Sequence, residues 1–190
     1  MKNMNKSLLF FIVISFVQPQ DLISSIEERF ENGFPKKISY YKESRKAVNG
    51  TMVDNLEKVK EKSYYWNGQI ENEGNWKNGK YHGKWIKYYE NGQIESEENY
   101  RDGSEHGKWA EYYENGQLKY EDSYKNGAQY GKLTEYYPNG QIKYEESVID
   151  GKYSILNAWN EDGKLLVRNG NGKWVTYYEN GQIENEENYR

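Results

Sequence analysis

The 190-residue chain contains no cysteine and only two histidines. Without thiols it can form no disulfide, thiolate metal site or cysteine nucleophile. Two histidines give little basis for a Ser/His/Asp arrangement. The formal net charge is −4, with acidic and basic residues interspersed, so no basic stripe suits a phosphate backbone. We therefore expect no catalytic residues, no cofactor and no nucleic-acid partner.

Aliphatic side chains are also scarce. Hydrophobic residues make up only 35% of the chain, whereas tyrosine occurs twenty times, tryptophan six times and glycine eighteen times. An apolar layer must then be built mostly from aromatic rings, which combine a large apolar face with a polar tip. This composition suits a thin, partly hydrated structure better than a thick two-layer core.

The one long apolar run lies at the N-terminus. Lys2 and Lys6 precede a run from Leu8 to Val17 that only Ser15 interrupts. This pattern is typical of a secretory signal peptide, and the run is short for a membrane span. We expect residues 1–20 to be a signal peptide or, alternatively, an uncleaved N-terminal anchor. The protein would then be secreted, periplasmic or held at the cell envelope of a bacterium.

A cassette of the form Tyr-Tyr-x-Asn-Gly-Gln-Ile/Leu recurs every 24 residues. Fixed spacing of this kind marks a tandem-repeat architecture. We assign residues 64–190 to the repeat array and residues 21–63 to a diverged first repeat with a charged insertion. Near the end, residues 177–190 repeat residues 88–101 with a single difference. The Asn-Gly pairs predicted to form structural turns are Asn67-Gly68, Asn91-Gly92, Asn115-Gly116, Asn139-Gly140 and Asn180-Gly181.

Asn-Gly between two strand-like runs is the strongest short hairpin signal, because a type I′ turn needs positive φ at both central residues. Each copy is therefore predicted to be a β-hairpin closed by a two-residue turn. That turn would place Tyr89 opposite Ile94 and Trp85 opposite Glu98. Strand alternation would then put Trp85, Tyr89, Ile94 and Tyr100 on one face.

A single hairpin of this kind is not expected to be stable by itself. An isolated two-stranded unit is marginal in water, so stability must come from neighbouring copies. Asp102-Gly103 and Asn126-Gly127 supply the turns that join one hairpin to the next. The spacing of hydrophobic residues from Leu22 to Phe30 fits a short amphipathic helix. The predicted fold is all-β, an elongated single-layer antiparallel sheet of tandem β-hairpin repeats, with room for a short N-terminal helix.

The strings Tyr-Tyr-Glu-Asn-Gly-Gln-Ile/Leu and Gly-Lys-Trp-x-x-Tyr-Tyr resemble those of the bacterial MORN-repeat variant family, whose members are often labelled YwqK-like antitoxins. The resemblance covers residues 64–190 well and residues 31–42 weakly. It implies a single-layer sheet of hairpins that is used for binding or scaffolding. No kinase signature accompanies it, since the chain has neither a Gly-rich loop followed by a lysine strand nor an Asp-Phe-Gly string.

Two sets of polar residues are candidates for chemistry. His82 and His106 share one repeat position, and a metal site would need their loops to converge on a carboxylate such as Glu105. We expect instead that each histidine packs on its own turn, so that no metal is bound. The Glu-rich strands could form carboxylate ladders for calcium or acid catalysis. A solvated face in which lysines alternate with the carboxylates is the simpler interpretation.

The aromatic rows are the remaining candidate surface. They would hold the repeats together, and the less buried rings would bind a ligand. We expect a protein or peptide partner, with a membrane or envelope surface, a glycan or a lipid as alternatives. The possible ligand-binding ring face comprises Trp85, Tyr89, Trp109, Tyr113, Tyr137, Trp174 and Tyr178.

These observations predict a non-enzymatic, exported repeat protein that acts as an interaction module. The alternative is an intracellular, antitoxin-like protein that binds a partner. The last strand, from Glu184 to Tyr189, would have no successor in the array. An unpaired strand offers its backbone donors and acceptors to another chain. Self-association or docking of a partner strand is therefore expected at this edge.

Overall fold

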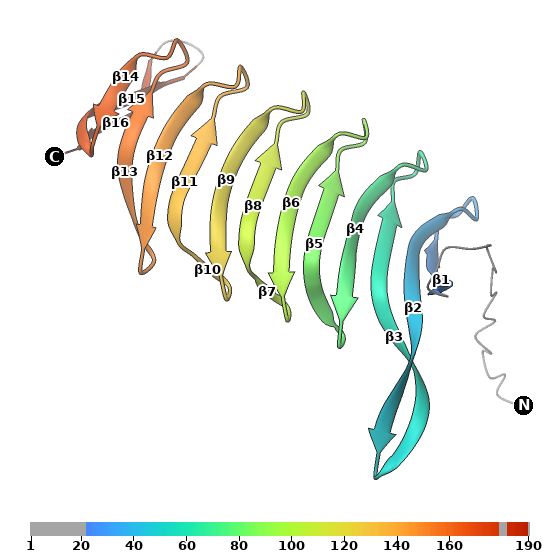
Figure 1. Ribbon diagram of the computed structural model, residues 1–190. Helices are drawn as coiled ribbons and strands as arrows, with labels where there is room; N and C mark the ends of the chain where they lie inside the picture. Colours follow the sequence, from blue (N-terminus) through green and yellow to red (C-terminus); the bar gives the residue numbers. More distant parts are fainter. Residues whose placement is uncertain (1–21, 179–181, 190) are drawn as a thin grey trace, which may run out of the picture.

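The computed structural model describes residues 22–178 and 182–189, where the chain is all-β and forms one open sixteen-stranded antiparallel sheet (Figure 1). The predicted signal peptide and the Asn180-Gly181 turn lie outside the described residues. The first eight strands are β1 (Leu22–Arg29), β2 (Pro35–Val48), β3 (Thr51–Tyr64), β4 (Ile70–Lys77), β5 (Lys80–Tyr88), β6 (Ile94–Arg101), β7 (Ser104–Glu105) and β8 (Gly107–Tyr112). The others are β9 (Leu118–Lys125), β10 (Ala128–Gln129), β11 (Gly131–Tyr136), β12 (Ile142–Ile149), β13 (Lys152–Trp159), β14 (Leu165–Arg168), β15 (Asn171–Tyr177) and β16 (Ile183–Tyr189).

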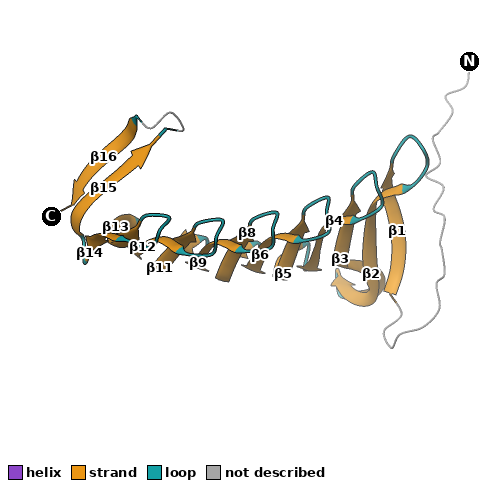
Figure 2. Cartoon of the chain, turned by 90° about the horizontal axis from the view of Figure 1, so that it is seen from above, coloured by secondary structure: helices purple, strands orange, loops and turns teal. Residues whose placement is uncertain are grey.

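The strands follow one another in space as they do in the chain. Only the two short strands leave this path, since β7 pairs with β6 and β10 with β9. The sheet is a single layer, and the hairpin of β15 and β16 bends out of its plane (Figure 2). The predicted architecture of tandem hairpins is thus confirmed. Within the described ranges, no helix is long and apolar enough to cross a membrane.

The cassette loops are hairpin turns, but not of the predicted type. The Tyr89 carbonyl accepts the Gly92 N–H at 2.9 Å, and the Tyr89 N–H donates to the Gln93 carbonyl at 2.8 Å. Gly92 has a φ of 84°, whereas Asn91 is not among the residues with positive φ. This combination is a three-residue loop, a type I turn followed by a left-handed glycine. The two-residue type I′ prediction for these loops is wrong.

The longer loop changes the pairing near the turn. Tyr88, not Tyr89, lies opposite Ile94, and a bulge separates this pair from the rest of the ladder. Beyond the bulge the predicted register is correct, with Trp85 opposite Glu98. Because paired residues share a face, Ile94 lies with Tyr88 and not with Trp85.

The turns between hairpins do have type I′ geometry. Asp102 and Gly103 have φ values of 52° and 89°, and Asn126 and Gly127 have values of 54° and 82°. Positive φ at both central residues defines this turn, and its twist matches that of the flanking strands. The prediction that these pairs join successive hairpins is confirmed.

The N-terminal segment is a strand and not the short helix that the hydrophobic spacing suggested. β1 pairs with β2, with Ile26 opposite Ile38. The connecting loop has the cassette geometry, because Phe30 bonds to Gly33 and Phe34 as Tyr89 does to its own loop. The diverged first copy therefore forms a hairpin, and the backbone bonds to β2 outweigh the helical spacing of a few apolar side chains.

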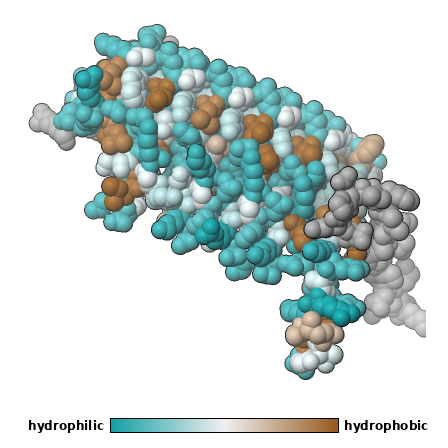
Figure 3. Space-filling model, viewed as in Figure 1, coloured by the Kyte–Doolittle hydropathy of each residue, from teal (hydrophilic) through white to brown (hydrophobic). Residues whose placement is uncertain are grey.

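The charged insertion extends this first region. β1 reaches only as far as Lys42 on β2, and β4 only as far as Lys60 on β3. Beyond these residues β2 and β3 continue as a hairpin that projects from the sheet to a tip at Asn49-Gly50 (Figure 1). The sheet surface viewed in Figure 3 is largely hydrophilic and is crossed by a row of hydrophobic residues.

The fully enclosed apolar core is small and lies in one part of the sheet. Leu133, Val148, Ala158 and Val167 are each at most 3% exposed, and they come from β11, β12, β13 and β14. Elsewhere in the described residues the deeply buried side chains are polar, such as Ser39. This distribution agrees with the thin structure that the composition predicts.

Candidate functional site

The two faces of the sheet carry different side chains. Trp85 on β5 lies opposite Glu98 on β6. Tyr100 lies two residues beyond Glu98 on β6, so the side chains of Trp85, Glu98 and Tyr100 share one face of the sheet. We call it the ring face. Ile86 and Glu97 pair with each other and point to the opposite face.

Four aromatic rings gather on the ring face. The Tyr81 ring lies 4.2 Å from that of Trp85 and 5.3 Å from that of Tyr100, measured between centroids. Trp76 completes the group at 4.7 Å from Tyr81. Tyr81 remains 38% exposed. The cluster therefore presents aromatic surface to solvent and has rings on three consecutive strands.

Gly74 explains how the Trp85 ring is placed. A Cβ atom added to Gly74 would lie 2.0 Å from the Cδ2 of Trp85, so the indole lies directly over the glycine. The indole N–H donates to the Asn75 carbonyl at 3.0 Å. The missing side chain at residue 74 thus lets the indole lie flat against β4.

The rings form one wall of an open groove of about 420 Å³, which we call the ring groove. The other wall is polar and comes from the first three strands, where Lys37 and Glu61 form an ion pair at 3.3 Å. Aromatic and charged groups therefore face the same space. The ring groove is lined by Glu28, Lys36, Lys37, Glu61, Ser63, Asn72, Tyr81, Trp85, Glu98 and Tyr100.

Hydrogen bonds fix the positions of Glu98 and Tyr100, which line the groove. Glu98 accepts from the Tyr100 hydroxyl at 2.7 Å and from the Ser96 hydroxyl at 3.2 Å. Burial, reinforced by the bond to Glu98, raises the pKa of Tyr100 above its usual range. The phenol stays neutral at physiological pH, and the carboxylate is fixed as an acceptor.

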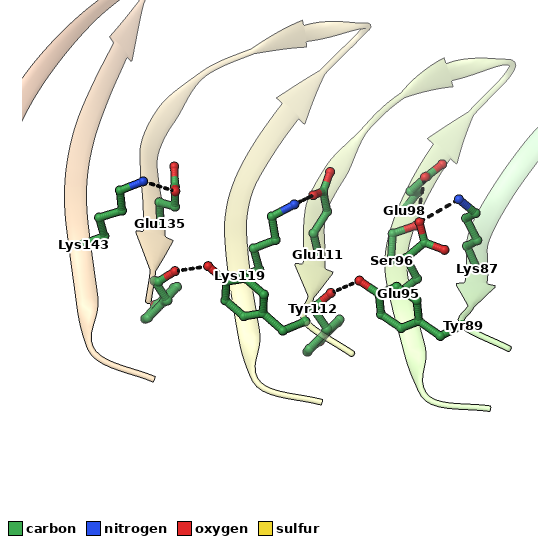
Figure 4. Close-up of polar contacts among 12 residues, drawn as sticks. Lys87, Tyr89, Glu95, Ser96, Glu98, Glu111, Tyr112, Lys119, Glu135 and Lys143 are labelled. Carbon is green, nitrogen blue, oxygen red and sulfur yellow. Dashed lines mark hydrogen bonds and ion pairs between the residues drawn. The ribbon is translucent and has the colours of Figure 1, made fainter. Parts of the chain in front are cut away.

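Three of the seven residues that the sequence predicted for ligand binding instead connect neighbouring repeats. Tyr89, Tyr113 and Tyr137 lie in the cassette loops, and each donates its hydroxyl to a carbonyl of the following repeat. The acceptors are Tyr112 at 2.6 Å, Tyr136 at 2.7 Å and Trp159 at 3.0 Å. Figure 4 shows the bond from Tyr89. These tyrosines tie the repeats together through hydrogen bonds, and their rings do not join Trp85.

The other predicted residues are dispersed. The Trp109 ring contacts Tyr124 at 5.1 Å, and the Trp174 ring contacts Tyr144 at 5.2 Å. Tyr178 is 53% exposed. Of the seven predicted ring-face residues, only Trp85 belongs to the ring groove.

Trp76 and Tyr81 were not among the residues predicted from the sequence. Tyr81 occupies the position that carries Glu105 in the next repeat, and this aromatic residue in place of a charged one was the available signal. Trp76 occupies the position of Tyr100, where the aromatic character is kept.

The cassette asparagines form a second row of hydrogen bonds, which link each cassette loop to the next. The Asn91 side chain accepts the Gln93 N–H at 2.9 Å within its own loop. Its Nδ2 donates to the Glu114 carbonyl of the next loop at 3.1 Å. Asn67, Asn115 and Asn139 make the same two bonds.

Many of the carboxylates form ion pairs with lysines. Glu73 bonds to Lys60 at 2.9 Å, to Lys62 at 3.2 Å and to the Tyr88 hydroxyl at 3.0 Å. Burial alone would raise the pKa of Glu73, but these three donors outweigh it and lower the pKa to about 2. Further pairs, of which Figure 4 shows the first three, are Lys87–Glu95, Lys119–Glu111, Lys143–Glu135, Lys84–Glu97, Lys132–Glu145 and Lys173–Glu186. Lys84 and Lys87 point to opposite faces of β5, so the ion pairs occur on both faces of the sheet and do not form the single charged face that was predicted.

The two histidines lie apart from any cluster of ligands. The Nδ1 of His82 is 3.6 Å from the Asp102 carboxylate, and neither this atom nor the Nδ1 of His106 has a hydrogen-bond partner among the described residues. In the part of the chain that the structure describes, no three His, Cys, Asp or Glu side chains are placed to hold a metal ion.

Comparison with known families agrees with the geometry. The model of the MORN repeat variant matches residues 59–78, 81–102, 105–126, 129–150 and 170–190, which together exceed half of the chain. No curated protein matches the chain. MORN repeats are generally binding or interaction modules. With its tandem hairpins and these five matched segments, the chain belongs to the MORN repeat variant family.

Proposed function

We propose that this protein is a non-enzymatic binding module that acts outside the cytoplasm of a bacterium, and that the ring groove holds a segment of a protein partner. The observation that carries the proposal is the juxtaposition of the Tyr81, Trp85 and Tyr100 rings with the charged wall of Lys37 and Glu61. Tyrosine and tryptophan dominate binding energy at protein interfaces, because they bury a large area at a low cost in side-chain entropy.

The groove favours a partner in an extended conformation. Its lining comes from strands β1 to β6, so it crosses several strands and is not a closed cavity. An extended peptide can lay apolar side chains on Tyr81 and Trp85 while its polar groups meet Ser63 and Asn72. A binding role of this kind needs no catalytic residue.

A capture experiment with matched tyrosine variants tests the groove. Tyr81→Ala removes an exposed ring from the groove, whereas Tyr130→Ala removes a ring that is 48% exposed and lies outside it. We expect the first change to weaken partner binding by about tenfold, as for an interface hot spot, and the second to leave it unchanged. Equal binding by both variants would assign the partner to another surface.

Export is tested separately. The run from Leu8 to Val17 supports it, and an arginine in place of Val13 would oppose membrane insertion. We expect Val13→Arg to keep the protein in the cytoplasm, as measured by cell fractionation. If the parent chain is itself cytoplasmic, the intracellular, antitoxin-like alternative replaces the exported one.

A further inference from the structure

The ring groove contains a carboxylate that has no basic partner among the described residues. The charged side chains that line the groove are Glu28, Glu61, Glu98, Lys36 and Lys37. Lys36 pairs with Glu28 at 3.6 Å, and Lys37 pairs with Glu61 at 3.3 Å. In the described part of the chain, Glu98 accepts hydrogen bonds from hydroxyl groups only. The lining therefore has an excess of negative charge, and this charge lies among the aromatic rings.

The Glu98 carboxylate is held in place and can still accept further hydrogen bonds. Its Oε1 accepts from the Ser96 hydroxyl, and its Oε2 accepts from the Tyr100 hydroxyl. A carboxylate oxygen has two lone pairs, so each of these oxygens can accept a second hydrogen bond. Two adjacent acceptors of this kind suit a ligand that presents two parallel N–H donors.

In the next repeat the chain itself supplies a donor to the equivalent carboxylate. Asp122 occupies the position of Glu98, is only 5% exposed, and accepts from the side-chain amide of Gln129. The residue equivalent to Gln129 in the repeat of Glu98 is Glu105, which lies opposite Tyr100 on the ring face. An ionised carboxylate cannot donate. The chain therefore provides no amide donor for Glu98 at this position and places a second carboxylate there instead.

The aromatic rings beside Glu98 favour a cation as the missing donor. The Tyr81 ring is 5.3 Å from the ring of Tyr100, whose hydroxyl bonds to Glu98. The face of an aromatic ring attracts an ammonium or guanidinium group within about 6 Å of its centre. The same cluster already binds one cation of the chain, because the Nζ of Lys58 lies 4.6 Å from the centre of the Trp76 ring. At the Glu98 end of the cluster, no cation of the described residues lies over a ring.

We propose that the ring groove binds an arginine side chain of the protein partner, with the guanidinium against the Tyr81 ring and two of its N–H groups donating to Glu98. This inference rests on the proposed function and names the residue that the groove selects. A guanidinium fits better than an ammonium, because it is planar, stacks on aromatic rings and presents two parallel donors to a carboxylate. Its positive charge also balances the excess negative charge of the lining.

Two blocked amino acids test this contact before the partner is identified. N-acetylarginine amide carries the guanidinium, whereas N-acetylcitrulline amide has nearly the same shape and no charge. Binding is followed by NMR through the indole N–H signal of Trp85, assigned with a Trp85→Phe variant. We expect the arginine probe to shift this signal with a Kd of about 1 mM, as for a ligand of this size, and the citrulline probe to bind at least about tenfold more weakly. Equal binding of the two probes, or no saturable shift with the arginine probe, would overturn the proposal.

A pair of neighbouring variants locates the contact. Glu98→Gln removes the charge and keeps an oxygen that can accept from the Tyr100 hydroxyl. Glu97→Gln is the matched control, because it removes the same charge from the adjacent residue, which points to the opposite face of the sheet. We expect Glu98→Gln to weaken binding of the arginine probe by about tenfold and Glu97→Gln to leave it unchanged. Equal losses would attribute the binding to the net charge of the protein and overturn the contact with Glu98.

Capture of the partner by the same variants separates this inference from the proposed function. We expect Tyr81→Ala and Glu98→Gln both to weaken capture, and Glu97→Gln to leave it unchanged. If Tyr81→Ala loses the partner while Glu98→Gln retains it, the groove is the binding site and the arginine inference alone is wrong. If Tyr81→Ala retains the partner, the proposed function of the groove is wrong, even where the arginine probe binds.

Discussion

At the scale of single residues, Gly74 makes room for the Trp85 indole, which lines the ring groove. Every other glycine in the described residues has positive φ, so Gly74 alone is required for space and not for backbone conformation. The equivalent residues in the next two repeats are Glu98 and Asp122. The sequence showed this departure from the pattern, but not that the Trp85 indole fills the space.

Replacement of Gly74 by alanine is expected to destabilise the protein by about 1–3 kcal/mol, because the new methyl group overlaps the indole. The free energy of unfolding, measured with denaturant, checks the magnitude. In a Trp85→Ala background the same change should leave the free energy of unfolding unaltered, because the effects of mutations at two residues in contact are not additive. Equal costs in both backgrounds would show that Trp85 is not the cause.

At the scale of the repeat unit, the hairpins could be predicted from the sequence, whereas their turn type could not. Asn-Gly is compatible with a two-residue type I′ turn and with a three-residue loop that ends in a left-handed glycine. In both the Tyr89 loop and the Phe30 loop the asparagine side chain accepts the N–H two residues further on, which favours the type I turn. The pair Asn-Gly alone does not distinguish the two kinds of loop. The extra loop residue explains the wrong register at Tyr89 and the dispersal of the predicted ring face.

Asn91→Asp tests the bond between repeats. The carboxylate keeps the acceptor for the Gln93 N–H and loses the donor to the Glu114 carbonyl. We expect a loss of about 1 kcal/mol in unfolding free energy. Asn32→Asp is the control, because among the described residues the Asn32 side chain bonds only within its loop, to the Phe34 N–H. A similar loss in both variants would attribute the effect to the added charge.

At the scale of the whole molecule, near-identical repeats suggest uniform stability, and the structure shows otherwise. The buried apolar side chains Leu133, Val148, Ala158 and Val167 all lie in β11 to β14. In the described part of the chain, no other strand pairs with the hairpin around Asn49-Gly50. In a repeat array each unit is stabilised mainly by its neighbours, so these differences in packing should appear as differences in local stability.

Hydrogen exchange measures these differences directly. Backbone amides are protected according to the free energy of the opening that exposes them. We expect the slowest exchange in β11 to β14, and the fastest in residues 43–57 and in the terminal hairpin of β15 and β16. Uniform exchange along the array would mean that the apolar core of β11 to β14 does not determine where the sheet opens first.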